Sequence, residues 1–528
     1  MGNKKLQVWM PLIFSVVMIV GMFFGYGLSG NKGKGFFKTD KQTALQEALD
    51  LIQLYYVDDV PLDSLEDVAI REMMNQLDPH SVYYPPVELQ AANEDLAGNF
   101  QGIGVEFNVF SDTVNIVYVI PDGPSDKAGL LIGDKIIKVN GHVLTGDHLS
   151  PDSIKKHIRG ESGSELSLAI YRDNKIVHKK VTRGTIPVPS VEAAYMIDDR
   201  IGYIKLEKFT ESSYEEFAQA LETLKKEGMK ELIYDLRGNG GGYMNEAFEM
   251  ADEFLDGDKL VVYTEGSNSR KREFRCKRPG LFEEGKLVLL VDELSASASE
   301  VLAGALQDWE RATIIGRRTF GKGLVQEQYE LSDGSAIRLT VARYYTPLGR
   351  SIQRPYDQGK KVYMDEVWQR YSNGEAMHPD SLKIATGKQY KTSSGKIVYG
   401  GGGITPDVFV PFDTSSYPSL INRLIIDGTF NNFVYQYYLR HKAEIDVFKS
   451  AEDYARNFNS GDEMWNEFVK SVSTDSISFR SVTNSQRESL ETRLEAFLAR
   501  FRWRTNGLYR ILNKSDNLFN EAVKQIKK

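Results

Sequence analysis

The chain has 528 residues, of which 41% are hydrophobic and 26% charged, with a formal net charge of −8 at pH 7. This length predicts three or four domains, and the composition is that of an ordinary globular protein. The negative charge, and the lack of a basic stripe interleaved with aromatics, argue against a nucleic-acid binder. The only cysteine, Cys276, excludes an intrachain disulfide, and we interpret it as incidental because no histidine lies nearby.

A long apolar run opens the chain. Lys4 and Lys5 precede an uncharged segment from Leu6 to Asn31, rich in Val, Ile, Met and Phe. As a helix it could span about 30 Å of hydrocarbon. It lacks a clear small-x-small cleavage site, so the sequence favours an uncleaved membrane anchor, with a cleaved signal peptide as the alternative. In both cases we expect the bulk of the chain to be exported.

Two segments with apolar residues at helical spacing follow, at Thr39 to Val57 and Leu62 to Leu77. The second ends at Asp78-Pro79, where proline stops a helix. We therefore expect a helical N-terminal region that closes with the motif LDPHSVYYPP and carries no chemistry.

From about Phe100 to Arg183 the pattern changes to short strands, among them VEFNVF, VNIVYVI and LSLAIYRD, with a helix near Ser153 to Ile158. This region resembles a PDZ domain. In PDZ domains a glycine-containing loop offers backbone N–H groups to a chain-terminal carboxylate, and the bound peptide adds as a strand. The residues that match this loop are Gly102, Ile103, Gly104 and Val105. A small β domain without a ligand is the alternative.

Strands and helices then alternate. We expect strands at Ile201 to Leu206 and Glu231 to Leu236, with a helix at Tyr214 to Lys226 between them. The second strand ends in the glycine-rich turn Arg237 to Gly242, where the backbone can approach a ligand closely. The turn contains no lysine, so a phosphate loop is unconvincing. We interpret Asp235 and Arg237 as a structural ion pair.

A serine stands at the next strand-to-helix turn. Ser297 lies between the strand-like segment Lys286 to Asp292 and the helix-like segment Val301 to Trp309. We expect it at the end of a sheet, beside unpaired N–H groups that can stabilise an oxyanion. A serine hydroxyl is a poor nucleophile until a base takes its proton, and no histidine lies close in sequence. Serine also favours helix N-caps, so a capping role is the alternative.

Lys322 follows a short strand at Ala312 to Gly316, and it could act as the base because burial favours the neutral amine. Gln326 lies four residues later, on the same face of a strand, so its amide oxygen could orient the amine. A solvated loop lysine is the alternative. The segment Gly316 to Gly323 also nearly matches the sequence motif of a phosphate-binding P-loop. However, Gly323 replaces the required Ser or Thr, and a strand follows where a helix is needed.

Several motifs together resemble the carboxyl-terminal processing proteases, a serine/lysine peptidase family. They are SASASE at Ser295 to Glu300, FGKGLVQ at Phe320 to Gln326, YDLRGNGGG at Tyr234 to Gly242, LTVARYYTPLGRSIQ at Leu339 to Gln353, and GITPD at Gly403 to Asp407. The resemblance runs from about Thr39 to Pro411. It implies that Ser297 is the nucleophile, Lys322 the general base and Gln326 its partner.

The same resemblance implies an oxyanion hole made by Ala298 with Gly240 or Gly241, and it does not choose between the glycines. In this family the PDZ domain recognises substrate tails and can gate the active site. The chain departs from the family between Arg354 and Gly400, where a polar stretch intervenes. This insertion is a candidate lid, substrate-guiding arm or dimer contact, or a passive surface loop. Beyond Leu420 the sequence predicts amphipathic helices, interpreted as a scaffold or oligomerisation element.

No HExxH, no CxxC and no carboxylate cluster at metal spacing occurs, so we expect no metal and no cofactor. The scattered histidines are interpreted as surface or structural residues: His80, His142, His148, His157, His178, His378 and His441.

The predicted fold is α/β and multidomain, with a crotonase-like protease core. The predicted parts are a transmembrane anchor or signal segment (1–38), a helical N-terminal region (39–95), a PDZ domain (96–185), a protease core (186–415, with an insertion at 355–400) and a helical C-terminal extension (416–528). The expected function is a serine endopeptidase of the cell envelope, anchored in the inner membrane with its bulk in the periplasm, or soluble there after signal cleavage.

The expected substrates are proteins or peptides with apolar C-terminal tails, and a homo-oligomer is possible. The alternatives are a catalytically inactive envelope PDZ scaffold and a crotonase-like acyl hydrolase.

Overall fold

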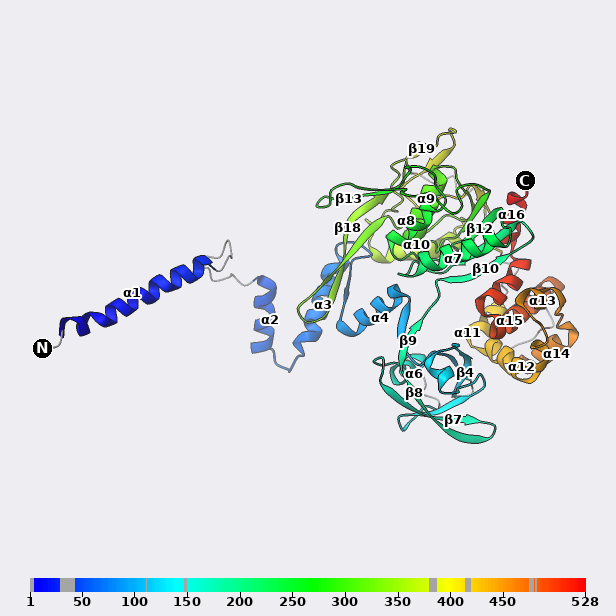
Figure 1. Ribbon diagram of the computed structural model, residues 1–528, viewed down its shortest axis with the longest axis horizontal. Coiled ribbons are helices and arrows are strands. Elements are labelled where there is room, and N and C mark those ends of the chain that lie inside the picture. The colour runs from blue at the N-terminus through cyan, green and yellow to red at the C-terminus, as the bar shows by residue number, and fades with distance from the viewer. Residues whose placement is uncertain are drawn as a thin grey trace. The chain divides into compact units, whose positions relative to one another are not determined.

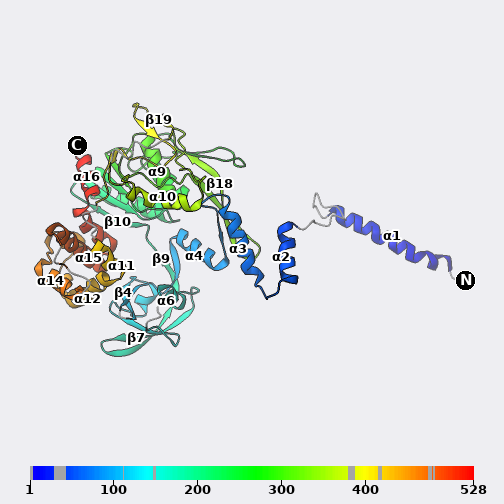
Figure 2. The same ribbon diagram turned by 180° about the vertical axis from the view of Figure 1, so that it is seen from behind.

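The computed structural model describes residues 4–28, 43–110, 112–146, 150–378, 387–413, 419–473, 479 and 482–528. The chain divides into two compact units, Met1–Ile70 and Arg71–Lys528, and each is described by itself (Figures 1 and 2). Parts of all the predicted segments lie outside the described residues: 1–3 and 29–38 of the N-terminal segment, 39–42 of the first predicted helix, 111 and 147–149 of the predicted PDZ domain (His148 among them), 379–386 of the insertion, and 414–418, 474–478, 480 and 481 before and within the predicted C-terminal helices.

The first unit is helical. It contains α1 (Lys4–Leu28), α2 (Ala44–Tyr55) and the start of α3 (Leu62–Asn75), which supports the predicted helical region. Thr43 caps α2, because its hydroxyl accepts from the Gln46 N–H while the Gln46 side chain accepts from the Thr43 N–H. Within the described residues, no helix has the length and apolarity that a bilayer crossing requires. The expected anchor is therefore not confirmed.

In the second unit, residues 99–187 form the small β domain expected from the sequence. Its sheet has the order β3-β4-β5-β7-β8, and β6 pairs with β5. The elements are β2 (Asn99–Gly102), β3 (Val105–Phe110), β4 (Thr113–Val119), α5 (Pro124–Lys127), β5 (Lys135–Val139), β6 (His142–Val143), α6 (Pro151–Ile158), β7 (Glu165–Arg172), β8 (Lys175–Thr182) and β9 (Gly184–Pro187). Leu166, Leu168 and Ile170 point from one face of β7 onto Ile154 and Ile158 of α6, which closes the core.

The main sheet of the protease-like core has the order β10-β11-β12-β15-β16-β21, and only β10 runs antiparallel to its neighbour. Its strands are β10 (Val191–Met196), β11 (Ile201–Leu206), β12 (Glu231–Asp235), β15 (Leu287–Val291), β16 (Thr313–Gly316) and β21 (Val408–Phe409).

The two faces of this sheet belong to different hydrophobic clusters. Leu232 and Tyr234 of β12 face the cluster that includes α7 (Ser213–Lys226), α8 (Met244–Asp252) and α9 (Ala298–Asp308). Ile233 faces the opposite cluster, which includes Phe519 of α16 (Asn517–Ile526). The last helix of the chain therefore completes the core, and the C-terminal extension is not a separate appendage.

A second, antiparallel sheet carries the lysine segment. Its order is β1-β18-β13-β14, and β17 also pairs with β18. The strands are β1 (Val82–Tyr84), β13 (Leu260–Glu265), β14 (Arg272–Arg275), β17 (Leu324–Glu330) and β18 (Ala336–Tyr345). The motif LDPHSVYYPP thus leads into β1 and α4 (Pro86–Ala97) beside the core, where the sequence predicted only the close of a helical region.

The insertion contains α10 (Lys360–Ser372) and the hairpin of β19 (Gln389–Lys391) and β20 (Ile397–Tyr399). Helices α11 (Ser419–Ile426), α12 (Thr429–Ile445), α13 (Ala451–Asn457), α14 (Gly461–Val472) and α15 (Asn484–Ser515) form a cluster with its own hydrophobic core. The cluster contacts the PDZ-like sheet, where Glu106 pairs with Arg500 and Arg504 and the Tyr435 ring packs at a tilt against Phe110.

Candidate active site

The turn between β15 and α9 holds Ser297 in a backbone conformation that is rare for a residue with a side chain, with φ 56° and ψ −112°. Such strained serines occur at functional turns, where surrounding contacts enforce the geometry. The two neighbouring serines are fully buried and their hydroxyls are engaged: Ser295 donates to the Leu236 carbonyl at 2.8 Å and Ser299 to the Asn239 carbonyl at 2.9 Å. Of the three serines, only Ser297 lines a large cavity, which is the candidate active-site cleft.

Lys322 lies in the loop between β16 and β17 and lines the same cavity as Ser297. Burial lowers the pKa of its amine to about 8, and the nearby Arg338 guanidinium acts in the same direction. The carboxylates of Glu300 and Asp78 oppose this shift. About half of the amine is therefore free of its proton near pH 8, and about a tenth at pH 7.

Gln326 lies on β17 and also lines the cavity. A register shift between Val325 and Gln326 interrupts the pairing with β18, as in bulges that redirect side chains near active sites. The Gln326 amide nitrogen donates to the Thr340 hydroxyl at 3.3 Å. The structure thus brings Ser297, Lys322 and Gln326 to one cavity.

A buried carboxylate ties the serine turn to the lysine loop. The Glu300 carboxylate accepts from the backbone N–H groups of Ser297 at 2.9 Å, Lys322 at 2.8 Å and Gly321 at 2.7 Å, and from the Thr319 hydroxyl at 2.5 Å. Burial raises the pKa of Glu300, and these donors stabilise its charged form. The sequence contained this residue in the SASASE motif, but nothing in the motif indicated its partners.

The glycine-rich turn after β12 faces the start of α9. A Cβ on Gly241, whose φ is +99°, would lie 2.8 Å from the Ser297 Cβ, so this approach requires glycine. The buried Asn239 shapes the turn: its side chain donates to the Leu206 carbonyl and accepts from the Gly241 N–H at 2.9 Å. Among the hydrogen bonds of the described residues, none uses the Gly240 N–H.

The expected ion pair of Asp235 and Arg237 is confirmed. The guanidinium approaches the carboxylate at 2.7 Å, and it also pairs with Asp516 from the C-terminal helices at 2.7 Å. Cys276 is buried, and burial raises the pKa of its thiol to about 12, consistent with an unreactive residue.

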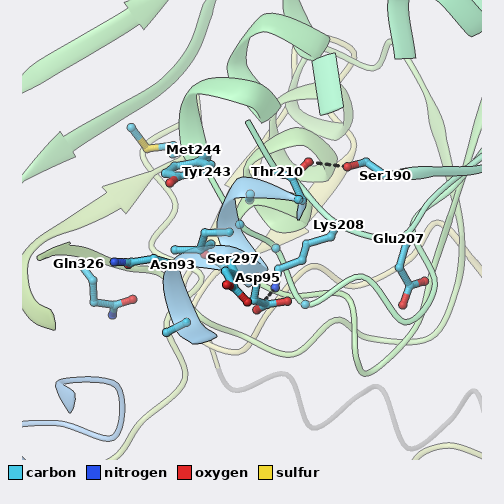
Figure 3. Close-up of a pocket in the computed structure, with 18 of the residues that line it drawn as sticks. Asn93, Asp95, Ser190, Glu207, Lys208, Thr210, Tyr243, Met244, Ser297 and Gln326 are labelled. Atoms are coloured by element: carbon cyan, nitrogen blue, oxygen red, sulfur yellow. Dashed lines mark hydrogen bonds and ion pairs between the residues drawn. The ribbon is translucent and has the colours of Figure 1, made fainter. Parts of the chain in front are cut away.

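The cavity has a volume of about 890 Å³. Helix α4 supplies Asn93 and Asp95, and Arg159 of the PDZ-like domain completes the wall. Figure 3 shows Ser297 with Gln326 and Tyr243 to one side and Lys208 and Glu207 to the other.

The insertion supports the lysine loop directly. Arg370 of α10 donates to the carbonyl oxygens of Arg318 at 2.9 Å, Thr319 at 3.0 Å and Phe320 at 3.3 Å. Tyr363 packs edge-on against Phe320. This segment is therefore an internal brace of the loop, a role that its polar sequence did not reveal.

Among the histidines that the structure describes, His80 lies close to the site. Its Nε2 is 2.9 Å from the Tyr363 hydroxyl, and burial, with the nearby Lys322 charge, lowers its pKa to about 3. The sequence analysis interpreted His80 as a surface or structural residue, and no local pattern indicated its place beside Lys322. Among the described residues, no group of three or more His, Cys, Asp or Glu is arranged to hold a metal ion.

The segment from Gly102 to Val105, which the sequence analysis matched with the carboxylate-binding loop of PDZ domains, lies at the end of β2 and the start of β3. Gly104 has φ +73°, and its carbonyl accepts from the Ile120 N–H while the Ile103 carbonyl accepts from Ser125. Gly102 belongs to β2, and Val105 begins β3, an edge strand of the sheet. An edge strand is what an incoming peptide needs for pairing.

Three regions of the chain match known families. Residues 200–359 match peptidase family S41, residues 101–182 match the PDZ domain, and residues 420–504 match a family of unknown function. The chain is 34% identical over 362 residues to a probable CtpA-like serine protease of Staphylococcus haemolyticus, covering 66% of this chain and 72% of the relative.

The chain is also 35% identical over 322 residues to the carboxy-terminal-processing protease of Bartonella bacilliformis, covering 60% of this chain and 73% of the relative. A solved structure, the photosystem II D1 C-terminal processing protease, shows 28% identity and a TM-score of 0.36, covering 69% of this chain and 92% of the other.

A PDZ domain joined to an S41 peptidase domain defines a class of PDZ-containing serine-type proteases. The chain belongs to peptidase family S41, with relatives named carboxy-terminal-processing protease and CtpA-like serine protease.

Proposed function

We propose that the protein is a serine endopeptidase in which Ser297 attacks the peptide bond and Lys322 is the general base. The observation that carries this proposal is the shared cavity: a strained, half-buried serine and a lysine whose amine pKa is lowered to about 8 line the same cleft. A lysine of this kind can accept a proton near neutral pH, as a serine nucleophile requires.

In the first half of the reaction the neutral Lys322 amine takes the Ser297 hydroxyl proton while Oγ bonds to the substrate carbonyl carbon. The carbonyl oxygen becomes an oxyanion, for which we assign the N–H groups of Ala298 and Gly240 as donors. This choice between the glycines rests on the Gly241 N–H being engaged by Asn239. The lysine ammonium then protonates the leaving amine as the C–N bond breaks, leaving an acyl-enzyme.

In the second half a water molecule attacks the ester carbonyl and gives a proton to the Lys322 amine. The ester C–O bond breaks, and the proton returns to the Ser297 oxygen. The product acid leaves, and the starting protonation state is restored. Gln326 orients the amine through its amide oxygen in both halves, which leaves the nitrogen lone pair directed at the reacting hydroxyl.

Substrate selection is assigned to the PDZ domain, with the loop from Gly102 to Val105 receiving an apolar C-terminal tail. The positive φ of Gly104 and the edge position of β3 support this assignment. The apolar N-terminal run supports a location in the cell envelope, by anchoring or by export.

The deciding experiment compares cleavage of an unfolded protein substrate by the unchanged enzyme and by Ser297→Ala, Ser295→Ala and Ser299→Ala. Ser297→Ala should lose all cleavage while keeping its fold and its affinity for tail peptides. Ser295→Ala and Ser299→Ala should retain cleavage, at the lower stability expected when a buried hydrogen bond is lost. Activity in Ser297→Ala would refute the proposal.

A further inference from the structure

Thr340 lies directly across from Gln326 and contacts its amide. The two residues are partners in the pairing of β17 with β18, so their side chains are neighbours on one face of the sheet. The Gln326 amide nitrogen donates to the Thr340 hydroxyl at 3.3 Å. When the NH₂ end is held toward β18, the oxygen end is left to face the cavity.

Thr340 is itself held by a buried chain of hydrogen bonds that starts in the LDPHS motif. Its backbone N–H donates to the Ser81 hydroxyl oxygen at 3.1 Å. The Ser81 hydroxyl donates its single hydrogen to Asp78 at 2.6 Å, so its oxygen is free to accept from Thr340.

Asp78 anchors this chain. It accepts from the N–H groups of His80 at 2.8 Å and Ser81 at 2.9 Å, and only 8% of its surface is exposed. The bonds from Ser81 to Asp78 and from the Thr340 N–H to Ser81 each have one possible donor, whereas the Thr340 hydroxyl can donate or accept and here accepts from the Gln326 amide nitrogen.

We infer that Thr340, held by Ser81 and Asp78, is a positioning residue that fixes the amide orientation of Gln326 for Lys322. The inference rests on the proposed roles of Lys322 and Gln326. If the amide turned over, its N–H groups would face the lysine and compete with the Ser297 hydroxyl for the amine lone pair. In the observed orientation the amide oxygen is left to accept from the amine, as the proposed role of Gln326 requires, so that the lone pair stays available.

The test uses two substitutions that leave the backbone bond to Ser81 in place. Thr340→Val keeps the branched shape that suits a strand but removes the hydroxyl, whereas Thr340→Ser keeps the hydroxyl. We expect kcat for a defined peptide to fall about tenfold in Thr340→Val with KM unchanged, the size of one lost hydrogen bond. Thr340→Ser should restore most of the lost kcat.

A double substitution separates positioning from general destabilisation. In a Gln326→Ala background, Thr340→Val should cause no further fall in kcat, because its effect passes through the missing amide. The same fall in both backgrounds would overturn the inference, as would unchanged kcat in Thr340→Val or equal losses in Thr340→Val and Thr340→Ser.

The outcomes also separate this inference from the proposed function. Normal activity in Gln326→Ala would overturn both the proposed role of Gln326 and the inference built on it. Impaired Gln326→Ala together with normal Thr340→Val would overturn the inference alone. Ser81→Ala should lower kcat in the same direction, and an unchanged kcat there would overturn the extension of the chain beyond Thr340.

Discussion

The Glu300 carboxylate accepts the Lys322 backbone N–H at 2.8 Å, and with the same oxygen it accepts the Ser297 N–H at 2.9 Å. One buried side chain therefore connects the two segments that carry the proposed nucleophile and base. Two further contacts join the same segments: the Phe320 N–H donates to the Ser295 carbonyl at 2.9 Å, and the Tyr344 hydroxyl lies 3.0 Å from the Ser297 carbonyl and 2.6 Å from the Lys322 carbonyl.

Glu300→Gln should sharply reduce both stability and activity. Each carboxylate oxygen accepts two hydrogen bonds, and an NH₂ group at either position would face two donors. Hydrogen bonds to charged groups contribute about 1.5–3 kcal/mol each, so we expect a loss of about 3 kcal/mol or more in unfolding free energy. Denaturant unfolding and kcat measure the two effects. The exposed Glu284→Gln is the control, and wild-type kinetics in Glu300→Gln would exclude the linking role.

The activity should depend on pH through Lys322. The neutral amine is the active form, so kcat/KM should rise about tenfold per pH unit below pH 8 and level off above it. Lys322→Arg should be as inactive as Lys322→Ala, because arginine cannot give up its proton at usable pH. A flat profile between pH 6 and 9 would mean that a different group limits the reaction.

The charge of Arg338 should shift the pH dependence of kcat/KM. Its guanidinium lowers the Lys322 pKa, so Arg338→Gln should raise that pKa and move the rising limb to higher pH. The matched control is Arg343→Gln, which removes an exposed charge from the same strand and should leave the limb in place. A shift toward lower pH in Arg338→Gln would contradict the assignment of the titrating group to Lys322.

The brace provided by α10 can be tested with Arg370→Lys. Lysine keeps the charge but cannot reach the carbonyls of Arg318, Thr319 and Phe320 together. We expect a lower melting temperature and a fall of about tenfold in kcat as the lysine loop loosens.

Arg311→Lys is the matched control for this brace, because Arg311 also donates to three backbone carbonyls, those of Phe254, Phe282 and Gly285. It should lose stability to a similar extent while kcat is kept. Equal losses of kcat in both variants would show that the effect is not specific to the loop.

The sequence was most informative where structure is local. The strand Ile201–Leu206 has the predicted bounds, and the serine lies at the predicted strand-to-helix turn, because hydrophobic periodicity and turn residues are read over short windows. The ion pair of Asp235 and Arg237 could be predicted for the same reason, because the two residues are only two positions apart in the sequence.

Contacts between distant segments could not be predicted from a single chain. His80 meets Tyr363 across 283 positions, and Thr340 meets Ser81 across 259. No local pattern encodes such pairings, because they depend on which sheet edge each segment joins. The same limit applies to α16, whose amphipathic sequence predicted a helix but not that it would cover the second face of the main sheet.

The last prediction concerns the substrate tail. If the loop from Gly102 to Val105 binds a terminal carboxylate, peptides with a free apolar C-terminus should be cleaved faster than their amidated counterparts. Amidation removes the charge and one acceptor oxygen, and losing a charge-assisted hydrogen bond costs about 1.5–3 kcal/mol, or roughly tenfold or more in binding. Gly104→Ala strains a backbone with φ +73° and should abolish this preference. Gly141→Ala, with a φ of +85° in a different turn, introduces similar strain away from the loop and should preserve it. Equal cleavage of acid and amide peptides by the unchanged enzyme would exclude carboxylate recognition while leaving the peptidase assignment intact.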